Sequence, residues 1–220
     1  MLSLVDVSKT YRTGLGEVRA LSEVNLRVGK GEFVVVCGPS GSGKTTLLMM
    51  IAAMLRPTGG SVIVDQSDIY KMSIRNRTLF RAGNIGFVFQ MFHLIPYLNV
   101  VENVTLARRV LAGADRSEEA KELLGQLGLA ERAYHKPGEL SAGEKQRTAI
   151  ARALINQPKI ILADEPTGNL DPQNAGTVLR HLSDFNRAGG TVIVATHGPV
   201  AHEFATKMVS LRNGWIEGVT

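Results

Sequence analysis

The feature that most constrains this chain is a short glycine-rich loop between two apolar segments. Residues 32–37 are apolar after their first position, and residues 46–55 are apolar on nearly every side of a helix. An apolar run without alternation is typical of a strand buried on both faces in a parallel sheet. A helix without a polar face must itself be buried. Strand, loop and helix together therefore predict one unit of an α/β fold.

The loop matches the pattern G-x-x-x-x-G-K-[ST]. The matching residues and the one after them are Gly38, Pro39, Ser40, Gly41, Ser42, Gly43, Lys44, Thr45 and Thr46. Glycines let successive backbone N–H groups converge on phosphate oxygens, beside the positive end of the helix dipole. Lys44 offers a charge to the β- and γ-phosphates, and Thr45 offers a hydroxyl to Mg²⁺. The loop predicts nucleotide binding, but kinases, GTPases, helicases and transport ATPases all share it.

Further apolar runs extend the α/β pattern along the chain. Residues 85–90, 160–163 and 191–195 predict strands, and helical patterning separates each from the next. This alternation indicates βαβ units around a mainly parallel sheet. Residues 208–217 predict a terminal hairpin with Asn213-Gly214 as its turn.

Two segments stand apart from the βαβ pattern. Residues 2–7, 22–28 and 61–64 predict the strands of an N-terminal antiparallel β subdomain, with a turn near Gly14 and Gly16. Residues 99–156 are mostly helical and interleave acids with bases, which indicates a solvated helical subdomain inserted between two core strands. Its apolar positions form two faces, Val100, Val104, Ala107 and Leu111 on one and Ala120, Leu123, Leu124 and Leu127 on the other.

We expect a single domain over residues 1–220. The core with its β subdomain covers approximately residues 1–90 and 157–220, and the helical subdomain covers approximately residues 91–156. No window reaches the roughly 18 to 20 apolar residues that span a bilayer, and the N-terminus lacks a secretory signal. One cysteine, Cys37, fits a reducing compartment. We therefore expect a cytoplasmic location.

Two acids, Asp164 and Glu165, close the apolar run of residues 160–163. An acid at the carboxyl end of a parallel strand points into the crevice where α/β sheets bind ligands. Asp164 is then suited to hold Mg²⁺ through water, and Glu165 to polarise an attacking water. Solvated acids at a strand end would be the better explanation if they stood alone. Beside the phosphate loop, the ligand roles are favoured.

A stretch that starts at Leu140 is the most specific signal in the chain. It reads Leu-Ser-Ala-Gly-Glu-Lys-Gln-Arg over residues 140–147. This resembles the signature motif of ATP-binding cassette (ABC) ATPases, which usually reads L-S-G-G-Q. Further marks of that family follow its order, namely Tyr11 for adenine stacking, Gln90 in the Q-loop, Asp171 in the D-loop and His197 as the switch histidine. The chain is identified as a member of this family over essentially its whole length.

The resemblance implies an ATPase that uses ATP and Mg²⁺. Its catalytic residues would be Glu165 as general base with His197, Gln90 and Lys44, and its metal residues Thr45, Gln90 and Asp164. Two copies would pair head to tail, with the signature residues Ser141, Ala142, Gly143 and Glu144 serving the nucleotide on the other copy. A separate transmembrane permease would be the partner, which places the chain peripherally on the inner face of the membrane.

Three segments favour one group within the family. Residues 89–96, 101–104 and 165–171 resemble the lipoprotein-release and macrolide-export ATPases, a group that also includes the cell-division ATPase. The leading interpretation is a subunit for export or lipoprotein release. The alternative is a mechanical or regulatory ATPase acting on a membrane partner. Soluble DNA-repair or translation relatives usually carry a long coiled-coil insertion or two cassettes, so the length disfavours them.

The sequence departs from the family pattern at three positions. Ala142 replaces the first signature glycine, Glu144 replaces the glutamine, and Gly198 stands where an acid often follows the histidine. Ser141 and Glu144 also have the spacing of a capping box, so the motif can both start a helix and bind an anion.

Charge and aromatic content leave two surface questions open. The formal charge of +5 fits phosphate binding and proximity to a membrane, and we expect no nucleic-acid partner. The basic residues Lys71, Arg75, Arg77 and Arg81 form either a solvated helix face or a contact with anionic lipid headgroups. The aromatic residues around Gln90 are Phe87, Phe89, Phe92 and Tyr97. We expect most of them to belong to the core and one or two to line a groove for the partner.

Overall fold

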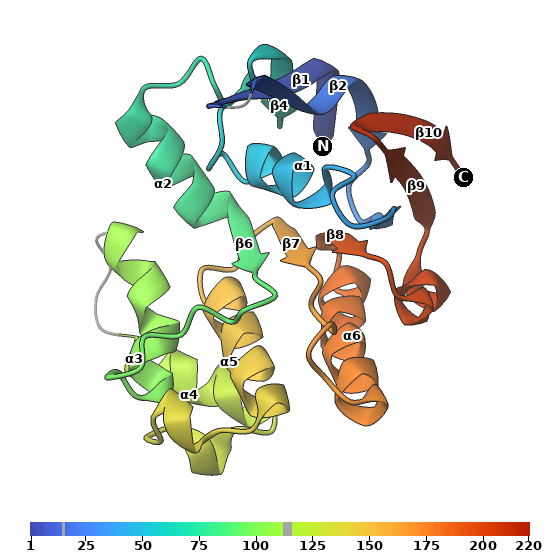
Figure 1. The fold of residues 1–220 in the computed structure, drawn as a ribbon. Coiled ribbons are helices and arrows are strands. Elements are labelled where there is room, and N and C mark those ends of the chain that lie inside the picture. Colours follow the sequence, from blue (N-terminus) through green and yellow to red (C-terminus); the bar gives the residue numbers. More distant parts are fainter. Residues whose placement is uncertain (15, 112–115) are drawn as a thin grey trace.

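The computed structural model describes residues 1–14, 16–111 and 116–220 (Figure 1). Its larger sheet has six strands in the order β10-β9-β3-β8-β7-β6. They are β3 (Phe33–Cys37), β6 (Ile85–Val88), β7 (Ile160–Asp164), β8 (Thr191–Thr196), β9 (Lys207–Arg212) and β10 (Trp215–Val219). Neighbours from β6 to β9 are parallel, and β10 runs antiparallel to β9. The predicted mainly parallel sheet is confirmed.

The two ends of this sheet differ in how well the sequence predicted them. Asn213 and Gly214 have φ angles of 49° and 82° between β9 and β10, which confirms the terminal hairpin and its turn. At the other end β6 stops at Val88, so the prediction of a strand as far as Gln90 was wrong. Beyond Val88 the chain leaves the sheet, and the Gln90 carbonyl accepts a hydrogen bond from the Asn169 side chain at 3.3 Å.

The second sheet is antiparallel, with four strands in the order β2-β1-β4-β5. They are β1 (Leu2–Thr13), β2 (Gly16–Val28), β4 (Gly59–Val64) and β5 (Ser67–Asp68). This confirms the antiparallel β subdomain. β1 and β2 are longer than predicted because their far halves pair as an exposed ribbon without apolar alternation. The predicted turn includes residue 15, which lies outside the described residues.

The helix after the glycine-rich loop, α1 (Lys44–Ile51), lies between the two sheets (Figure 1). Leu47, Leu48 and Met50 are 0% exposed and pack in one hydrophobic cluster with residues of both sheets. The prediction of a buried helix is therefore confirmed for most of its residues, while Thr45 in the first turn is exposed. The helix ends at Ile51 instead of residue 55, because the chain turns away with Ala53 at a φ of 57°.

The other helices cover the flanks and one end of the molecule (Figure 1). They are α2 (Ile74–Asn84), α3 (Val100–Thr105), α4 (Ser117–Gln126), α5 (Ala142–Leu154) and α6 (Pro172–Arg187), with 3₁₀ helices η1 (Leu106–Leu111), η2 (Ala130–Arg132), η3 (Pro137–Glu139) and η4 (Pro199–Phe204). None of the described helices is long and apolar enough to cross a bilayer.

The helical subdomain shares a core with the sheet. Val100, Val104 and Leu124 pack in the same hydrophobic cluster as Val88 and Ile161 of the strands. The expected solvated subdomain is therefore solvated on its outer side and joined to the sheet on its inner side. The predicted face that starts at Val100 does not continue as one α-helix, since α3 gives way to the tighter η1.

The basic residues around α2 divide into two kinds. The Arg77 guanidinium lies 5.3 Å from the centroid of the Tyr70 ring, and Arg81 Nη1 donates to a backbone carbonyl beyond α1 at 3.3 Å. Lys71 and Arg75 are exposed. Contact with lipid headgroups stays a prediction, and it concerns chiefly these two exposed residues.

Candidate functional site

A cavity of about 540 Å³ opens beside the N-terminus of α1. It lies at the carboxyl edge of the parallel sheet, where α/β folds bind ligands. Its walls are Ala20, Pro39, Ser40, Gly41, Ser42, Gly43, Lys44, Thr45, Thr46, Gln90, Glu165 and His197. The fold therefore brings most of the predicted nucleotide and catalytic residues into one space.

The loop needs glycine at the start of α1. Gly43 has a φ of 106°, and a Cβ there would lie 2.5 Å from the carbonyl oxygen of Ala20. Ala20, in β2, lines the cavity, although no sequence motif includes it. It contributes through its backbone position beneath the loop, and no side-chain signal could have revealed that.

Lys44 is held inside the loop that precedes it. Its side chain is 8% exposed, and Nζ donates to the carbonyls of Gly38 at 2.8 Å and Pro39 at 3.1 Å. Nζ also lies 3.9 Å from Glu165 Oε1. The ammonium group is thus fixed at the mouth of the loop, where phosphate oxygens would meet it.

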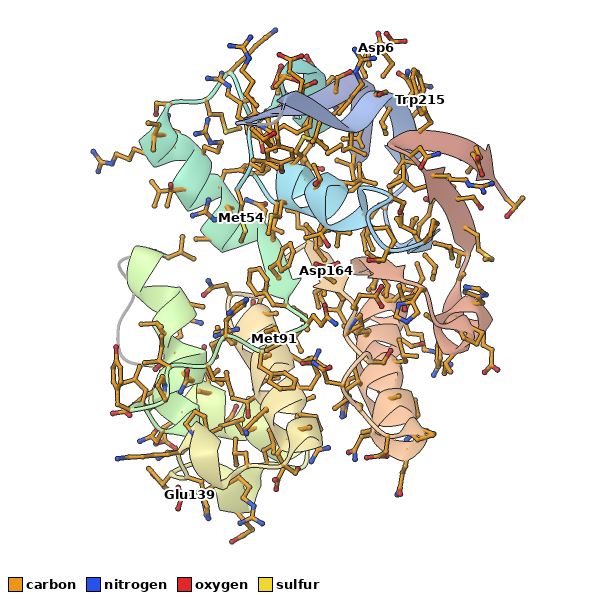
Figure 2. All side chains as sticks on the ribbon, viewed as in Figure 1. Asp6, Met54, Met91, Glu139, Asp164 and Trp215 are labelled. Atoms are coloured by element: carbon orange, nitrogen blue, oxygen red, sulfur yellow. The ribbon has the colours of Figure 1, made fainter. Side chains whose placement is uncertain are left out.

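The predicted metal residues Thr45 and Asp164 meet directly. Thr45 Oγ1 donates to Asp164 Oδ1 at 3.1 Å, and Asp164 lies at the end of β7 in the middle of the molecule (Figure 2). Burial raises the pKa of Asp164, against the hydrogen bond from Thr45. A carboxylate whose charged form is disfavoured by burial gains from a nearby cation, so this pair suits Mg²⁺.

Glu165 and His197 form the second pair in the cavity. His197 Nδ1 lies 2.9 Å from Glu165 Oε1, and the glutamate side chain is 13% exposed. Its other oxygen, Oε2, is buried and has no hydrogen-bond partner among the described residues. Glu165 also has a φ of 44°, held by its N–H donating to the Ala195 carbonyl. One carboxylate oxygen is therefore oriented and the other is left to accept a proton.

The predicted Q-loop residue lines the cavity, and the predicted D-loop residue does not. Gln90 lines the cavity, and its side-chain nitrogen reaches the close neighbourhood of Gly168. Asp171 is the N-cap of α6, where Oδ1 accepts from the Asn174 N–H at 2.9 Å. That hydrogen bond lowers the pKa of Asp171. Asp171 is thus placed by helix capping and not by contact with the cavity.

Tyr11 lies in β1, where it pairs with Val18 of β2. Its ring is exposed, and Lys9 Nζ lies 5.2 Å from the ring centroid. The described residues that line the cavity do not include Tyr11. Its role in adenine stacking therefore stays a prediction.

The four signature residues start α5, away from the cavity lining. Ser141 is the N-cap, and its Oγ accepts from the Glu144 N–H at 3.3 Å, while Glu144 Oε2 accepts from the Ser141 N–H at 2.8 Å. The capping box predicted from the sequence is confirmed. Gly143 lies against Asn174 of α6, and a Cβ on it would meet that side chain's oxygen. Ala142 is exposed in the first turn.

The sequence profile of the ABC transporter family matches residues 21–168. The chain belongs to the ABC transporter family. This ABC ATPase is 44% identical over 218 residues to the lipoprotein-releasing system ATP-binding protein LolD of Hyphomonas neptunium, with 97% of this chain and 95% of LolD covered. It is 41% identical over 216 residues to the macrolide export ATP-binding/permease protein MacB of Chlorobaculum tepidum, with 97% of this chain and 33% of MacB covered.

A solved structure matches the whole fold of the ABC ATPase. It is the dimeric post-hydrolysis state of the ATP-binding cassette MJ0796 of Methanocaldococcus jannaschii, bound to ADP and Pi. The TM-score is 0.94 at 41% identity, and the match covers 100% of this chain and 98% of the other. The expected cassette fold and the resemblance to the lipoprotein-release and macrolide-export group are thereby confirmed.

Proposed function

We propose that this ABC ATPase is a subunit of a membrane complex that pairs head to tail with a second copy on binding ATP. ATP hydrolysis then drives a separate transmembrane permease of the lipoprotein-release or export type. The names of LolD and MacB support this type, and the dimeric MJ0796 cassette supports the pairing. The observation that carries the proposal is the Glu165–His197 pair, which lies beside Lys44 in the cavity.

Each residue of the cavity has a role in phosphoryl transfer. Lys44 holds the β- and γ-phosphate oxygens, and the N–H groups of the loop surround them. Glu165 Oε2, buried without a partner in the described chain, accepts the proton of the attacking water. His197 orients the carboxylate through Nδ1 and can reach a γ-phosphate oxygen through Nε2. Gln90 positions the water and reports its state to the permease.

The residues present fit a magnesium ion held together with the phosphates. The described residues contain no cluster of three or more His, Cys, Asp or Glu side chains, so few protein groups would bind it directly. Thr45, Gln90 and Asp164 supply oxygen atoms, which Mg²⁺ prefers, alongside water and phosphate. When bound, Mg²⁺ offsets the charge that builds on the β- and γ-phosphate oxygens.

A second cavity, of about 210 Å³, supports a docking place for the permease. It lies between α2, β6 and α5, with Met54 and Phe89 in its walls. Arg152, from α5, also lines it and donates to the carbonyls of Phe92 at 2.5 Å and His93 at 2.6 Å. A partner seated here would contact both α5 and the segment that follows Gln90. Of the four aromatic residues around Gln90, Phe87 is buried in the core and Phe89 is partly buried against it. Phe92 is half-buried and Tyr97 is exposed, so the prediction that most of the four belong to the core was wrong.

Light scattering on Glu165→Gln tests the proposal. This variant keeps nucleotide binding and loses the general base, so we expect it to be a dimer in ATP and a monomer without nucleotide. A Glu165→Gln chain that stays monomeric in saturating ATP would contradict the head-to-tail pair.

Co-purification with a membrane protein tests the coupling. Turnover that depends on a transported ligand would support transport, and turnover that depends on the permease alone would favour the mechanical or regulatory alternative. Full ATPase activity without any membrane partner or lipid would contradict coupling of either kind.

A further inference from the structure

The signature segment carries a charge where the family motif has a neutral glutamine. Glu144 Oε2 accepts from the Ser141 N–H, and this hydrogen bond is the main reason that the pKa of Glu144 is lowered to about 2. The carboxylate is therefore ionised at neutral pH. A glutamine would close the same capping box without a charge, so capping alone does not account for the glutamate.

The second carboxylate oxygen is paired with an arginine from another element. Arg132, the last residue of η2, donates from Nε to Glu144 Oε1 at 2.9 Å. The same guanidinium lies 3.2 Å from His135 Nε2 through Nη1. The Arg132 side chain is 43% exposed and that of Glu144 17%. Because the Arg132 side chain is partly exposed, we expect this ion pair to contribute little to the free energy of folding. The pair lies at the start of α5, where its charges can act on a ligand.

The start of α5 can bind an anion if the negative charge of Glu144 is balanced by a positive charge. The first N–H groups of a helix have no partner within the helix, and here the Glu144 N–H is used by Ser141. The N–H groups of Ala142 and Gly143 have no acceptor within the helix because they lie in its first turn, and the helix dipole favours an anion beside them. An unpaired carboxylate within the same turn would repel that anion.

We propose that Arg132 neutralises Glu144 so that the start of α5 can approach the γ-phosphate of ATP bound to the second copy. The inference rests on the head-to-tail dimer of the proposed function. Arg132 acts through Glu144 and is a positioning residue. It lies outside the signature segment of residues 140–147, and its role follows from the pair with Glu144.

Variants that remove or keep the charge of Arg132 test this role, each made in the Glu165→Gln protein, which serves as the parent. ATP-dependent dimerisation is followed by light scattering as ATP is raised. We expect Arg132→Ala to raise the ATP concentration at half-maximal dimerisation roughly three- to tenfold, the scale of a partly screened ion pair. Arg132→Ala/Glu144→Gln should return to within about twofold of the parent, because no carboxylate is then left unpaired. Arg132→Lys, which keeps the positive charge beside Glu144, should stay within about twofold as well.

Two controls separate charge from structure. Arg187, in the last turn of α6, is 77% exposed and pairs with Asp184 at 3.8 Å, so Arg187→Ala removes the same charge away from the signature and should have no effect. The Arg132→Ala defect should shrink as salt is raised from 0.05 to about 0.5 M, since ions screen exposed charges.

The outcomes distinguish this inference from the proposed dimer. If the parent dimerises and Arg132→Ala equals it, or if the double variant is as weak as Arg132→Ala, charge balance is overturned while the dimer stands. If the parent stays monomeric at every ATP concentration, the dimer is overturned and this inference falls with it.

Discussion

The N-termini of α1 and α5 are capped in opposite ways. The N-cap of α1 is Gly43, which has a left-handed φ and no side chain to offer, and this helix end opens into the 540 Å³ cavity. The N-cap of α5 is Ser141, which forms a full capping box with Glu144. The first helix end is enclosed by cavity walls within one chain. The second does not line that cavity, and Ser141 and Ala142 are exposed there.

The comparison shows that the residue at a helix start decides whether the first backbone N–H groups depend on a ligand. A glycine start leaves backbone N–H groups free and makes the helix end depend on its ligand. A serine–glutamate start satisfies the helix in the absence of a ligand. We therefore expect changes at α1 to abolish nucleotide binding by the single chain, and changes at α5 to affect association of two chains.

The largest effect is expected from Lys44→Ala. The variant loses the charge that Nζ presents at the mouth of the loop, so ATP affinity should fall on the order of 100-fold, the worth of a charge-assisted contact with phosphate. Isothermal titration calorimetry measures it. Lys71→Ala, which changes an exposed lysine outside the cavity lining, is the control and should bind ATP like the parent. An ATP affinity of Lys44→Ala equal to that of the parent would contradict ATP binding at the start of α1.

Adding a methyl group at the start of α1 and removing one at the start of α5 should change the free energy of unfolding by different amounts. Gly43→Ala combines a φ of 106° with a Cβ at 2.5 Å from the Ala20 carbonyl, and we expect about 2 to 3 kcal/mol of destabilisation. Ala142→Gly makes the reverse change in the exposed first turn of α5 and should cost below about 1 kcal/mol. Urea unfolding of both variants measures the difference. Similar losses in the two would contradict the contrast.

Gly143→Ala is expected to have an intermediate effect. The added Cβ meets the Asn174 side chain, whose amide nitrogen also donates to Asp171, the N-cap of α6, at 2.6 Å. We expect about 1 to 2 kcal/mol of destabilisation, and shortening the opposing side chain in Gly143→Ala/Asn174→Ala should recover part of it. Thermal unfolding of the single and double variants gives the coupling. Additive losses would show that α5 and α6 do not meet as described.

The smallest effect concerns pH. The pKa of Glu144 is lowered to about 2 in the folded chain from an ordinary value of 4.5. A lowered pKa contributes stability above about pH 4.5, and that stability is lost as the pH falls towards 2. Glu144→Gln should therefore lose less stability than the parent between pH 7 and 3, by about 1 kcal/mol after allowance for solvent screening. Identical losses would contradict the ionised carboxylate at α5.

The α1 site could be predicted from the sequence because its signal is local. Residues 38–46 are consecutive, and the buried segments beside them fix a strand and a helix. Asp164 and Glu165 were found because a strand end places its acids at the same edge of the sheet. The capping box at α5 is likewise a fixed spacing of two residues.

The parts that the sequence did not predict depend on contacts between distant residues. Ala20 lines the cavity through its backbone, and Arg132 reaches Glu144 across twelve positions of the chain. Neither carries a pattern of its own. The long ribbon of β1 and β2 escaped prediction because exposed strand pairs lack apolar alternation. β6 ends at Val88 although Phe89 continues the apolar run, so the run alone does not show where the strand ends.

A mixing experiment tests most directly the claim that α5 of one chain completes the α1 site of another. Lys44→Ala removes the α1 site, and Ser141→Arg blocks the start of α5, so each variant alone should fail to hydrolyse ATP. In a head-to-tail pair of the two, one composite site keeps an intact Lys44 and an intact Ser141. The account predicts that the mixture regains single-turnover ATP hydrolysis. A mixture as inactive as either variant alone would contradict it.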